Sequence, residues 1–292
     1  MKKKCYLCDN SSYEVVGQSI KKGIDVRRCN SCGLEYLRSF DHISSDYYLL
    51  SGMRDNEKNP NADNLNCENF MEWRKVTQQD DFRRYSSLVG DIENNTILDF
   101  GCGNGGFLSY AKEKAHRTIG VELDENSREH MKMDHLEVYP NISYIPPDVK
   151  FDLIVSFHVF EHLKDPALVL KKLSSLIKPE GKIILEMPNS DDALKTIYNC
   201  EEFSQFTYRD DHLMLFNTSN ISLLVEKSGM KVSRVFQFQR YPLSNHLYWL
   251  SAGKPNGHAV WDFLISETAN KEYEKCLSSA GRCDTVLVEA KK

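Results

Sequence analysis

The sequence of 292 residues has no long hydrophobic segment. No apolar run approaches the ~18 residues that a membrane-spanning helix needs. The first residues, Met1–Asn10, contain a cluster of lysines but no apolar stretch of the kind found in secretory signals. From these two absences we expect a cytoplasmic protein without a membrane partner.

A strong charge of one sign is also absent. The 37 lysines and arginines and 42 aspartates and glutamates give a formal net charge of −5. No basic stripe interleaved with aromatic residues appears, although nucleic-acid binding surfaces typically have one. Such a chain has no general attraction for nucleic acid or anionic membranes, so a small-molecule partner is favoured. The sequence gives no indication of the oligomeric state.

The cysteines lack the pattern of a disulfide framework, because their number is nine and five of them are scattered. The other four form two Cys-x2-Cys pairs, Cys5 with Cys8 and Cys29 with Cys32, separated by twenty residues. Two such pairs can place four thiolates tetrahedrally around zinc, and Gly33 permits the tight turn after the second pair. A redox dithiol and a chance arrangement are the alternatives.

We interpret residues 1–40 as a zinc ribbon with short strands at Tyr13–Gln18 and Ile24–Arg28. A ribbon this small has little apolar core, so the metal supplies much of its folding free energy. Its eight basic residues outnumber its four acidic ones, but a zinc tetrathiolate itself carries two negative charges. The ribbon can therefore serve nucleic acid, a protein partner or the scaffold, and the sequence leaves these roles open.

A glycine-rich segment, Ile97–Gly106, passes from an apolar strand through Asp99 into a loop and a helix at 107–114. Gly101, Gly103 and Gly106 fit the G-x-G-x-x-G spacing of NAD sites. However, a fixed carboxylate two residues before the first glycine would repel a pyrophosphate. A cationic ligand without phosphate, such as S-adenosylmethionine, suits the Asp-x-Gly-x-Gly-x-Gly form of this loop.

A second acidic residue, Glu122, ends the next expected strand, Arg117–Glu122, and follows Gly101 by 21 residues. A carboxylate at about this distance commonly holds a ribose diol, although a solvated glutamate at a strand end is also common. Together the two acids favour a cofactor site over that alternative.

Over roughly Asp91–Lys292 the sequence resembles the class I S-adenosylmethionine-dependent methyltransferases. The resemblance implies a Rossmann-like α/β fold with a seven-stranded sheet whose last strand is antiparallel. Further strands are expected at 136–139, 151–157, 182–187, 232–239 and 284–290, with helices at 168–177, closed by Lys178–Gly181, and at 221–228. The expected cofactor-binding residues are Asp99, Gly101, Cys102, Gly103, Glu122, Leu123, Phe157 and His158.

Two segments extend the expected methyltransferase domain of residues 91–292. We interpret residues 41–90 as a helical lid or linker, with an Asn-rich loop at 56–69 and a helix over 70–88 covering one side of the sheet. Tyr48 and Trp73 are candidates to touch the ligand. An insertion at 240–283, with a helix near 259–277, forms part of the acceptor pocket or a partner surface. The helix over 70–88 places on recurring faces Phe70, Trp73, Val76, Phe82, Tyr85 and Leu88.

His162 and His212 are the candidate catalytic bases, because imidazole titrates near neutral pH. The zinc module, the Phe157–His162 segment and the Asp211–His212 pair with Phe216 resemble the sugar-nucleotide C-methyltransferases. That resemblance implies that both histidines flank a sugar acceptor. Arg209 and Asp211 differ from that family's Tyr-x-Glu-His motif, so O- and N-methylation of a sugar in polysaccharide or other sugar metabolism also remain open.

Three alternatives remain for the function. Glu161 and His162 resemble the acidic-His element of ubiquinone-pathway O-methyltransferases, which use a divalent ion, although His158 replaces that family's first glutamate. An RNA methyltransferase that grips its substrate with the ribbon is a second interpretation. A binding protein that retains a vestigial cofactor loop is the third.

Overall fold

The computed structural model describes residues 4–44 and 70–292. Its chain forms two compact units, of which the first comprises 1–40, 160–170 and 185–290 and the second comprises 41–159, 171–184 and 291–292. Tyr48 and the expected loop at 56–69 lie outside the described residues. Within the described ranges, no helix combines the length and the apolar character needed to cross a membrane.

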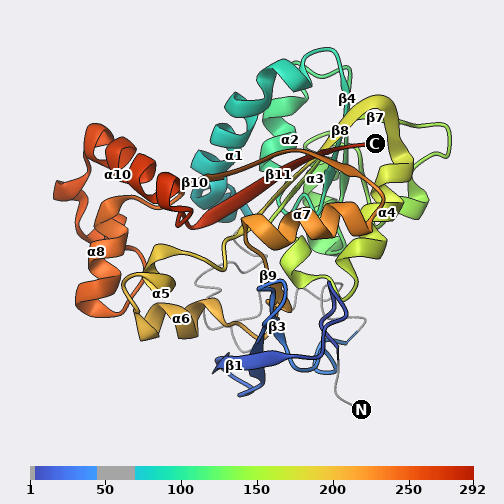
Figure 1. The fold of residues 1–292 in the computed structure, drawn as a ribbon. Helices are drawn as coiled ribbons and strands as arrows, with labels where there is room; N and C mark the ends of the chain where they lie inside the picture. The colour runs from blue at the N-terminus through green and yellow to red at the C-terminus, as the bar shows by residue number, and fades with distance from the viewer. Residues whose placement is uncertain (1–3, 45–69) are drawn as a thin grey trace. The chain divides into compact units, whose positions relative to one another are not determined.

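A seven-stranded mixed sheet confirms the predicted α/β class (Figure 1). Each expected strand exists, and the strand at Phe151–Phe157 has the predicted bounds. The pairs that β4 makes with β5 and β7, and that β5 makes with β6, are parallel. In order across the sheet the strands are β10 (Lys231–Phe238), β11 (Thr285–Lys291), β8 (Ile177–Pro188), β7 (Phe151–Phe157), β4 (Thr96–Phe100), β5 (Arg117–Val121) and β6 (Val138–Tyr139).

The core of the second unit surrounds β4, which lies between β5 and β7. Ile97 and Leu98 are fully buried, as expected for a parallel strand with neighbours on both sides. The helices α1 (Phe70–Ile92) and α2 (Gly106–Ala111) pack on each other, and α3 (Glu125–Met133) follows β5. The sheet therefore fixes the loops that follow the carboxyl ends of β4, β5 and β7.

Two details of this unit differ from the prediction. Helix α1 does not bury all the expected apolar positions, since Val76 and Phe82 are 76% and 53% exposed while Asp81 is buried. The segment 178–181 was expected to end a helix, but it lies inside β8. Helix α4 (Pro166–Leu176) ends earlier, and the strand begins directly at Ile177.

The first unit contains a four-stranded antiparallel sheet made from two distant parts of the chain (Figure 1). Strands β1 (Tyr13–Gln18), β2 (Asp25–Cys29) and β3 (Glu35–Leu37) come from the predicted ribbon. The fourth strand is β9 (Met214–Leu215), whose Leu215 pairs with Glu35. The ribbon therefore shares its sheet with the segment that directly follows His212.

The insertion at 240–283 forms separate helices rather than one helix near 259–277. Helix α9 (Gly257–Val260) ends before α10 (Glu267–Ala280) begins, because the Ser266 side chain accepts a hydrogen bond from the Ala269 N–H and caps a new helix. Trp249 of α8 (Leu243–Ala252) is buried. Other helices of this unit are α5 (Ala193–Thr196), α6 (Glu201–Thr207) and α7 (Thr218–Lys227).

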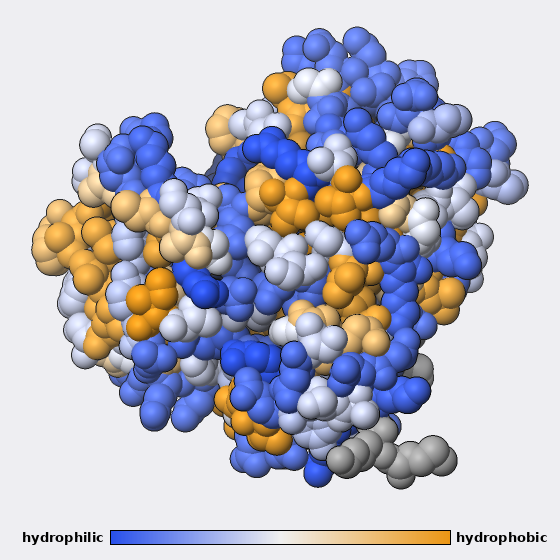
Figure 2. Space-filling view, in the orientation of Figure 1, coloured by the Kyte–Doolittle hydropathy of each residue, from blue (hydrophilic) through white to orange (hydrophobic). Residues whose placement is uncertain are grey.

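Several large apolar side chains of the insertion are exposed. Figure 2 shows orange, hydrophobic atoms at the left of the view, the side on which Figure 1 labels α8. A surface of this kind fits the predicted role as an acceptor pocket or partner surface, which stays a prediction. The exposed residues are Leu247, Leu250, Val260, Phe263, Leu264 and Ile265.

Candidate functional site

The loop after β4 requires glycine at two positions. Gly101 has φ +80°, and a Cβ there would lie 2.3 Å from a methyl carbon of Val159. Gly103 has φ +56°, and its Cβ would lie 3.3 Å from the Trp73 ring. Both backbone angles belong to the left-handed region that L side chains rarely adopt. At these glycines the backbone therefore lies close to Val159 and Trp73, where a side chain would not fit.

Asp99 is a buried carboxylate at the carboxyl end of β4. It is 2% exposed, and this burial, reinforced by the negative charges of Asp81 and Glu122 and opposed by Arg84, raises its pKa to about 8. Within the described ranges of the chain, its Oδ1 is buried and accepts no hydrogen bond. A buried carboxylate in this condition favours a cationic ligand, because a positive charge would offset the lost hydration.

Glu122 follows β5 and holds the loop from the other side. Its Oε2 accepts the Gly103 N–H at 2.9 Å, and its Oε1 accepts the Asp124 N–H at 2.9 Å. A carboxylate has about four lone-pair positions, so each oxygen keeps capacity for a further donor such as a hydroxyl. The neighbouring Leu123 is exposed, whereas Cys102 is buried with its Sγ 3.7 Å from the Met131 sulfur.

Phe157 is the last residue of β7, and His158 follows it in the same unit. The Phe157 and Phe107 rings form a T-shaped contact with their centroids 5.2 Å apart, and the Arg84 guanidinium lies 4.6 Å from the centre of the Phe157 ring. His158 has φ +56°, an uncommon value for a residue with a side chain. The predicted cofactor-binding residues thus lie at the carboxyl ends of β4, β5 and β7 and in the loops that follow these strands.

Helix α1 contributes polar residues that the sequence analysis did not assign to the site. Arg74 Nε donates to the Asn104 carbonyl at 3.0 Å, and Asn104 Nδ2 donates to Thr77 Oγ1 at 3.0 Å. Asp81 accepts from Thr77 at 2.8 Å and, with Arg84, sets the charge around Asp99. These residues recur every three or four positions, so a polar stripe on α1 was the available signal.

His162 and His212 lie together in the first unit, with ring centroids 5.2 Å apart. His162 belongs to the 3-10 turn η3 (Phe160–His162), and its Nδ1 donates to the Asp211 carbonyl at 2.7 Å. His212 Nδ1 donates to the Thr207 carbonyl at 3.0 Å. Because a carbonyl only accepts, each neutral ring keeps its lone pair on Nε2. Both rings can therefore accept a proton or bind a metal through Nε2.

Burial keeps His212 neutral at neutral pH. Burial, together with the Arg209 charge, lowers the His212 pKa to about 4. Asp211 is also buried, which opposes its ionisation, but Arg209 and the two histidines hold the pKa of Asp211 below its usual range. The Arg209 guanidinium binds both Asp211 oxygens, at 2.8 and 2.7 Å. This ion pair fixes the segment that carries His212.

Glu161 lies beside the two histidines, although the sequence analysis did not place it in the catalytic pair. One possible ligand atom from each of Glu161, His162 and His212 lies within 4.8 Å of the others. Two imidazoles and a carboxylate suit several divalent ions. The two histidines can thus act as general bases, or the three residues together can bind a metal ion. The cluster belongs to a different unit from the glycine loop.

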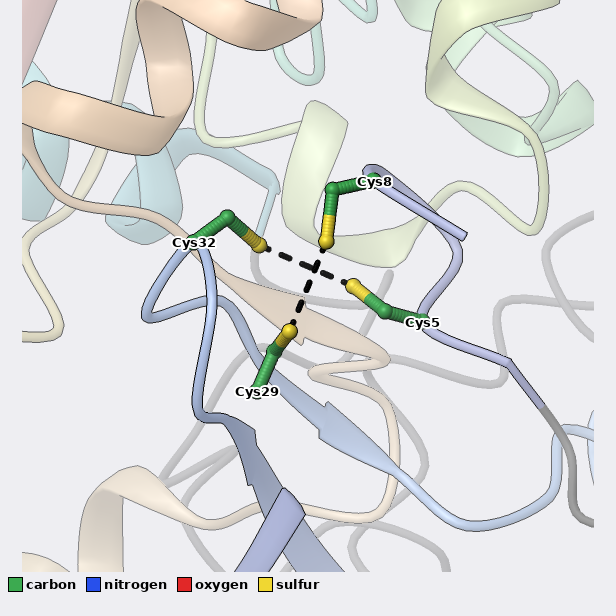
Figure 3. Close-up of side chains that lie close together, drawn as sticks. All are labelled: Cys5, Cys8, Cys29 and Cys32. Atoms are coloured by element: carbon green, nitrogen blue, oxygen red, sulfur yellow. Dashed lines mark hydrogen bonds between the residues drawn. The ribbon is translucent and has the colours of Figure 1, made fainter. Parts of the chain in front are cut away.

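The four predicted metal ligands of the ribbon point their sulfurs toward one centre (Figure 3). The Sγ atoms of Cys5 and Cys32 are 3.7 Å apart, and those of Cys8 and Cys29 are 3.5 Å apart. Tetrahedral zinc with bonds of about 2.3 Å separates its sulfurs by about 3.8 Å. The thiol of Cys32, helped by backbone N–H groups, lowers the pKa of Cys5 to about 5, so thiolate forms readily there.

A family model described as a methyltransferase domain matches residues 71–235, more than half of the chain. A protein of Mycolicibacterium smegmatis named as a probable S-adenosylmethionine-dependent methyltransferase is 30% identical over 116 residues, which are 37% of this chain and 45% of that protein. The chain thus covers less than half of that relative. A ubiquinone biosynthesis O-methyltransferase of Coxiella burnetii is 27% identical over 167 residues, 53% of this chain and 71% of that protein.

The fold has a counterpart among solved structures. The crystal structure of a SAM dependent methyltransferase from Archaeoglobus fulgidus has a TM-score of 0.52 and 21% sequence identity to this chain. The alignment covers 75% of this chain and 94% of the archaeal one. At this identity the likeness concerns the fold alone.

Proposed function

This chain belongs to the methyltransferase domain family and is a methyltransferase that depends on S-adenosylmethionine, and we propose that its acceptor is a sugar or nucleotide sugar. The donor supplies an electrophilic methyl group on a sulfonium when it is bound. Asp99 carries this assignment, because a buried carboxylate beside a glycine loop suits a cationic group. We assign the ribose hydroxyls to Glu122, whose oxygens retain acceptor capacity.

The paired histidines support a hydroxylated acceptor. Both Nε2 atoms have lone pairs, so two neighbouring hydroxyl groups of a sugar can each donate a hydrogen bond to one ring. With a pKa near 4, His212 is a weak base at neutral pH and suits orientation of the acceptor. We assign removal of the acceptor proton to His162. Alignment and exclusion of water then account for most of the rate enhancement.

We assign zinc to the four cysteines of the ribbon. Their sulfur separations fit a tetrahedral ion, and no other ligand type is required. As a site with four protein ligands it has no open position for substrate, so its role is structural.

A screen of nucleotide sugars with labelled S-adenosylmethionine tests the acceptor. We expect methylation of at least one sugar, and a loss of about a hundredfold or more in kcat/KM for His162→Gln, within the range of general-base catalysis. His116→Gln, an exposed histidine of the second unit, should retain full activity and is the matched control. Absence of transfer to every sugar, with transfer to an RNA or a phenol instead, would contradict the proposal.

Metal-assisted O-methylation of a phenolic acceptor is the second candidate function. The observation that favours it is the convergence of Glu161, His162 and His212, whose ligand atoms lie within 4.8 Å of one another. A relative named as a ubiquinone biosynthesis O-methyltransferase matches 53% of this chain. Electron paramagnetic resonance of added Mn²⁺ separates the two functions. Binding that Glu161→Gln abolishes would support this candidate, and no binding would favour the sugar acceptor.

A further inference from the structure

The ribbon contacts the loop that carries His212 through backbone groups on both sides of that histidine. The N–H of Ile20 donates to the Tyr208 carbonyl at 2.9 Å, and the N–H of Leu37 donates to the Leu213 carbonyl at 3.0 Å. Between them, the N–H of Lys22 donates to Asp210 Oδ1 at 3.2 Å. The loop 207–213 is thus attached to the ribbon before, within and after its turn.

The same loop provides the carbonyl oxygens that orient the two imidazoles. His162 donates to the carbonyl of Asp211, and His212 donates to the carbonyl of Thr207. These bonds decide which ring nitrogen keeps the lone pair. A shift of the loop would therefore change the orientation of both rings, including His162, which belongs to a different part of the chain.

A buried ion pair strengthens the attachment. Glu35 of β3 is 1% exposed, and its Oε2 accepts from Lys195 Nζ of α5 at 2.6 Å. Its Oε1 accepts from Arg28 Nη2 at 2.6 Å. Tyr208, at the start of the loop, lies in the same cluster, with its ring centre 5.3 Å from Lys195 Nζ. Removal of Lys195 would leave Glu35 paired with Arg28 of its own ribbon and would break the buried ion pair that joins β3 to α5.

The second cysteine pair lies in the turn that leads into β3. Cys29 ends β2, and its N–H donates to the Leu34 carbonyl at 2.9 Å, closing the turn that contains Cys32. Glu35 begins β3 directly after this turn. A metal ion held by Cys29 and Cys32 would fix the turn and hence the start of the strand that contacts the loop.

We propose that the ribbon is the positioning element of the acceptor site, and that the buried Glu35–Lys195 pair, which lies against Tyr208, supports the hydrogen bonds between the ribbon and the histidine loop. The acceptor role in this inference rests on the proposed function, whereas the effect of the ribbon on the orientation of the two histidines does not depend on the identity of the acceptor. Metal bound by the cysteines fixes β3, β3 and the turn at 20–22 fix the loop 207–213, and the loop sets the direction of both Nε2 lone pairs. Lys195 and Glu35 are positioning residues, since they act through the loop.

The experiment compares full-length Lys195→Met with Lys195→Arg, which keeps the charge, and with Lys271→Met. Lys271 also pairs with a glutamate at 2.6 Å, but that pair is exposed on α10, so it is the matched control. Long-range ¹H–¹⁵N spectra report the tautomer of each imidazole without any acceptor. We expect Lys195→Met to change the signals of His162 and His212 and to lower acceptor kcat/KM by about tenfold to a hundredfold. Donor affinity should stay within about twofold, because Asp99 and Glu122 belong to the other unit.

A second arm keeps the test valid if Lys195→Met does not fold. Metal is removed from the unmodified full-length protein with a chelator and then restored as Zn²⁺, while the same histidine signals are followed. We expect both signals to change on removal and to recover on addition. Unchanged tautomers in the metal-free protein, or in a folded Lys195→Met variant, would overturn the inference. Metal-dependent tautomers without transfer to any sugar would support it and contradict the proposed acceptor.

Discussion

We predict that the charge of Asp99 makes donor binding depend on pH. Burial raises the pKa of this carboxyl to about 8 in the donor-free protein, so at neutral pH most molecules hold it protonated. The cationic donor prefers the ionised form, and binding therefore releases a proton. We predict that affinity rises with pH up to about 8 and that Asp99→Asn removes this dependence.

The magnitude follows from the fraction of ionised carboxyl. With a pKa of about 8, roughly one molecule in ten is ionised at about pH 7, and roughly one in a hundred at about pH 6. The apparent dissociation constant should thus be about tenfold weaker at about pH 7 than at about pH 9, and about a hundredfold weaker at about pH 6. Nearly one proton should be released for each donor bound at neutral pH.

The same carboxyl lowers the stability of the donor-free protein. Since its folded-state pKa is raised, its contribution to the free energy of unfolding is most favourable below the unfolded value and is lost as pH rises toward about 8. At about pH 7, some three units above an ordinary aspartate, the loss is about 4 kcal/mol. Asp99→Asn should therefore stabilise the donor-free protein by up to that amount while weakening donor binding.

Titration calorimetry in buffers of different ionisation enthalpy measures both the affinity and the proton release. Asp148→Asn, an exposed aspartate of the same unit, is the matched control and should behave like the unmodified protein. Denaturant unfolding gives the stability change. An Asp99→Asn protein that binds the donor with unchanged affinity and the same pH slope would refute the assignment of the cationic group to Asp99.

Three further predictions concern other residues. Glu122→Ala should weaken donor binding about tenfold to a hundredfold, as expected for the loss of charge-assisted hydrogen bonds of about 1.5 to 3 kcal/mol. Calorimetry checks this. Cys32→Ser should lose one equivalent of metal by mass spectrometry, whereas Cys276→Ser, an exposed cysteine outside the cluster, should keep it. Burial lowers the pKa of His246 to about 4, so below about pH 6.5 the unfolded state binds more protons than the folded state. The free energy of unfolding should therefore fall by about 2 kcal/mol at about pH 5. His246→Gln should flatten this dependence on pH in denaturant titrations.

The sheet and the glycine loop could be predicted because their signals are local. The strand Phe151–Phe157 is a continuous apolar run, as expected for a strand buried on both faces, and its bounds are confirmed. The positive φ angles of Gly101 and Gly103 are likewise implied by the glycines themselves.

Long-range strand pairing leaves no local signal in the sequence, and on α1 the apolar pattern drew attention away from the polar one. The two residues of β9 have no periodic pattern, and their pairing with β3 depends on a partner far away in the sequence. On α1 the apolar periodicity pointed to Val76 and Phe82, which are exposed, while the polar residues Arg74, Thr77 and Asp81 face the loop. The break before α10 was signalled only by Ser266, a capping residue.

The pairing of Glu35 with Leu215 has a consequence for synthesis of the chain. During translation β3 leaves the ribosome 180 residues before its partner strand exists, so for many seconds the nascent ribbon presents an open sheet edge. Early binding of metal by the cysteines would let the ribbon fold first, so that the edge of β3 is already formed when β9 is synthesised and pairs with it. In cells short of metal, new chains would then have a loop 207–213 without a folded ribbon to pack against, and such chains are natural substrates for chaperones and proteases.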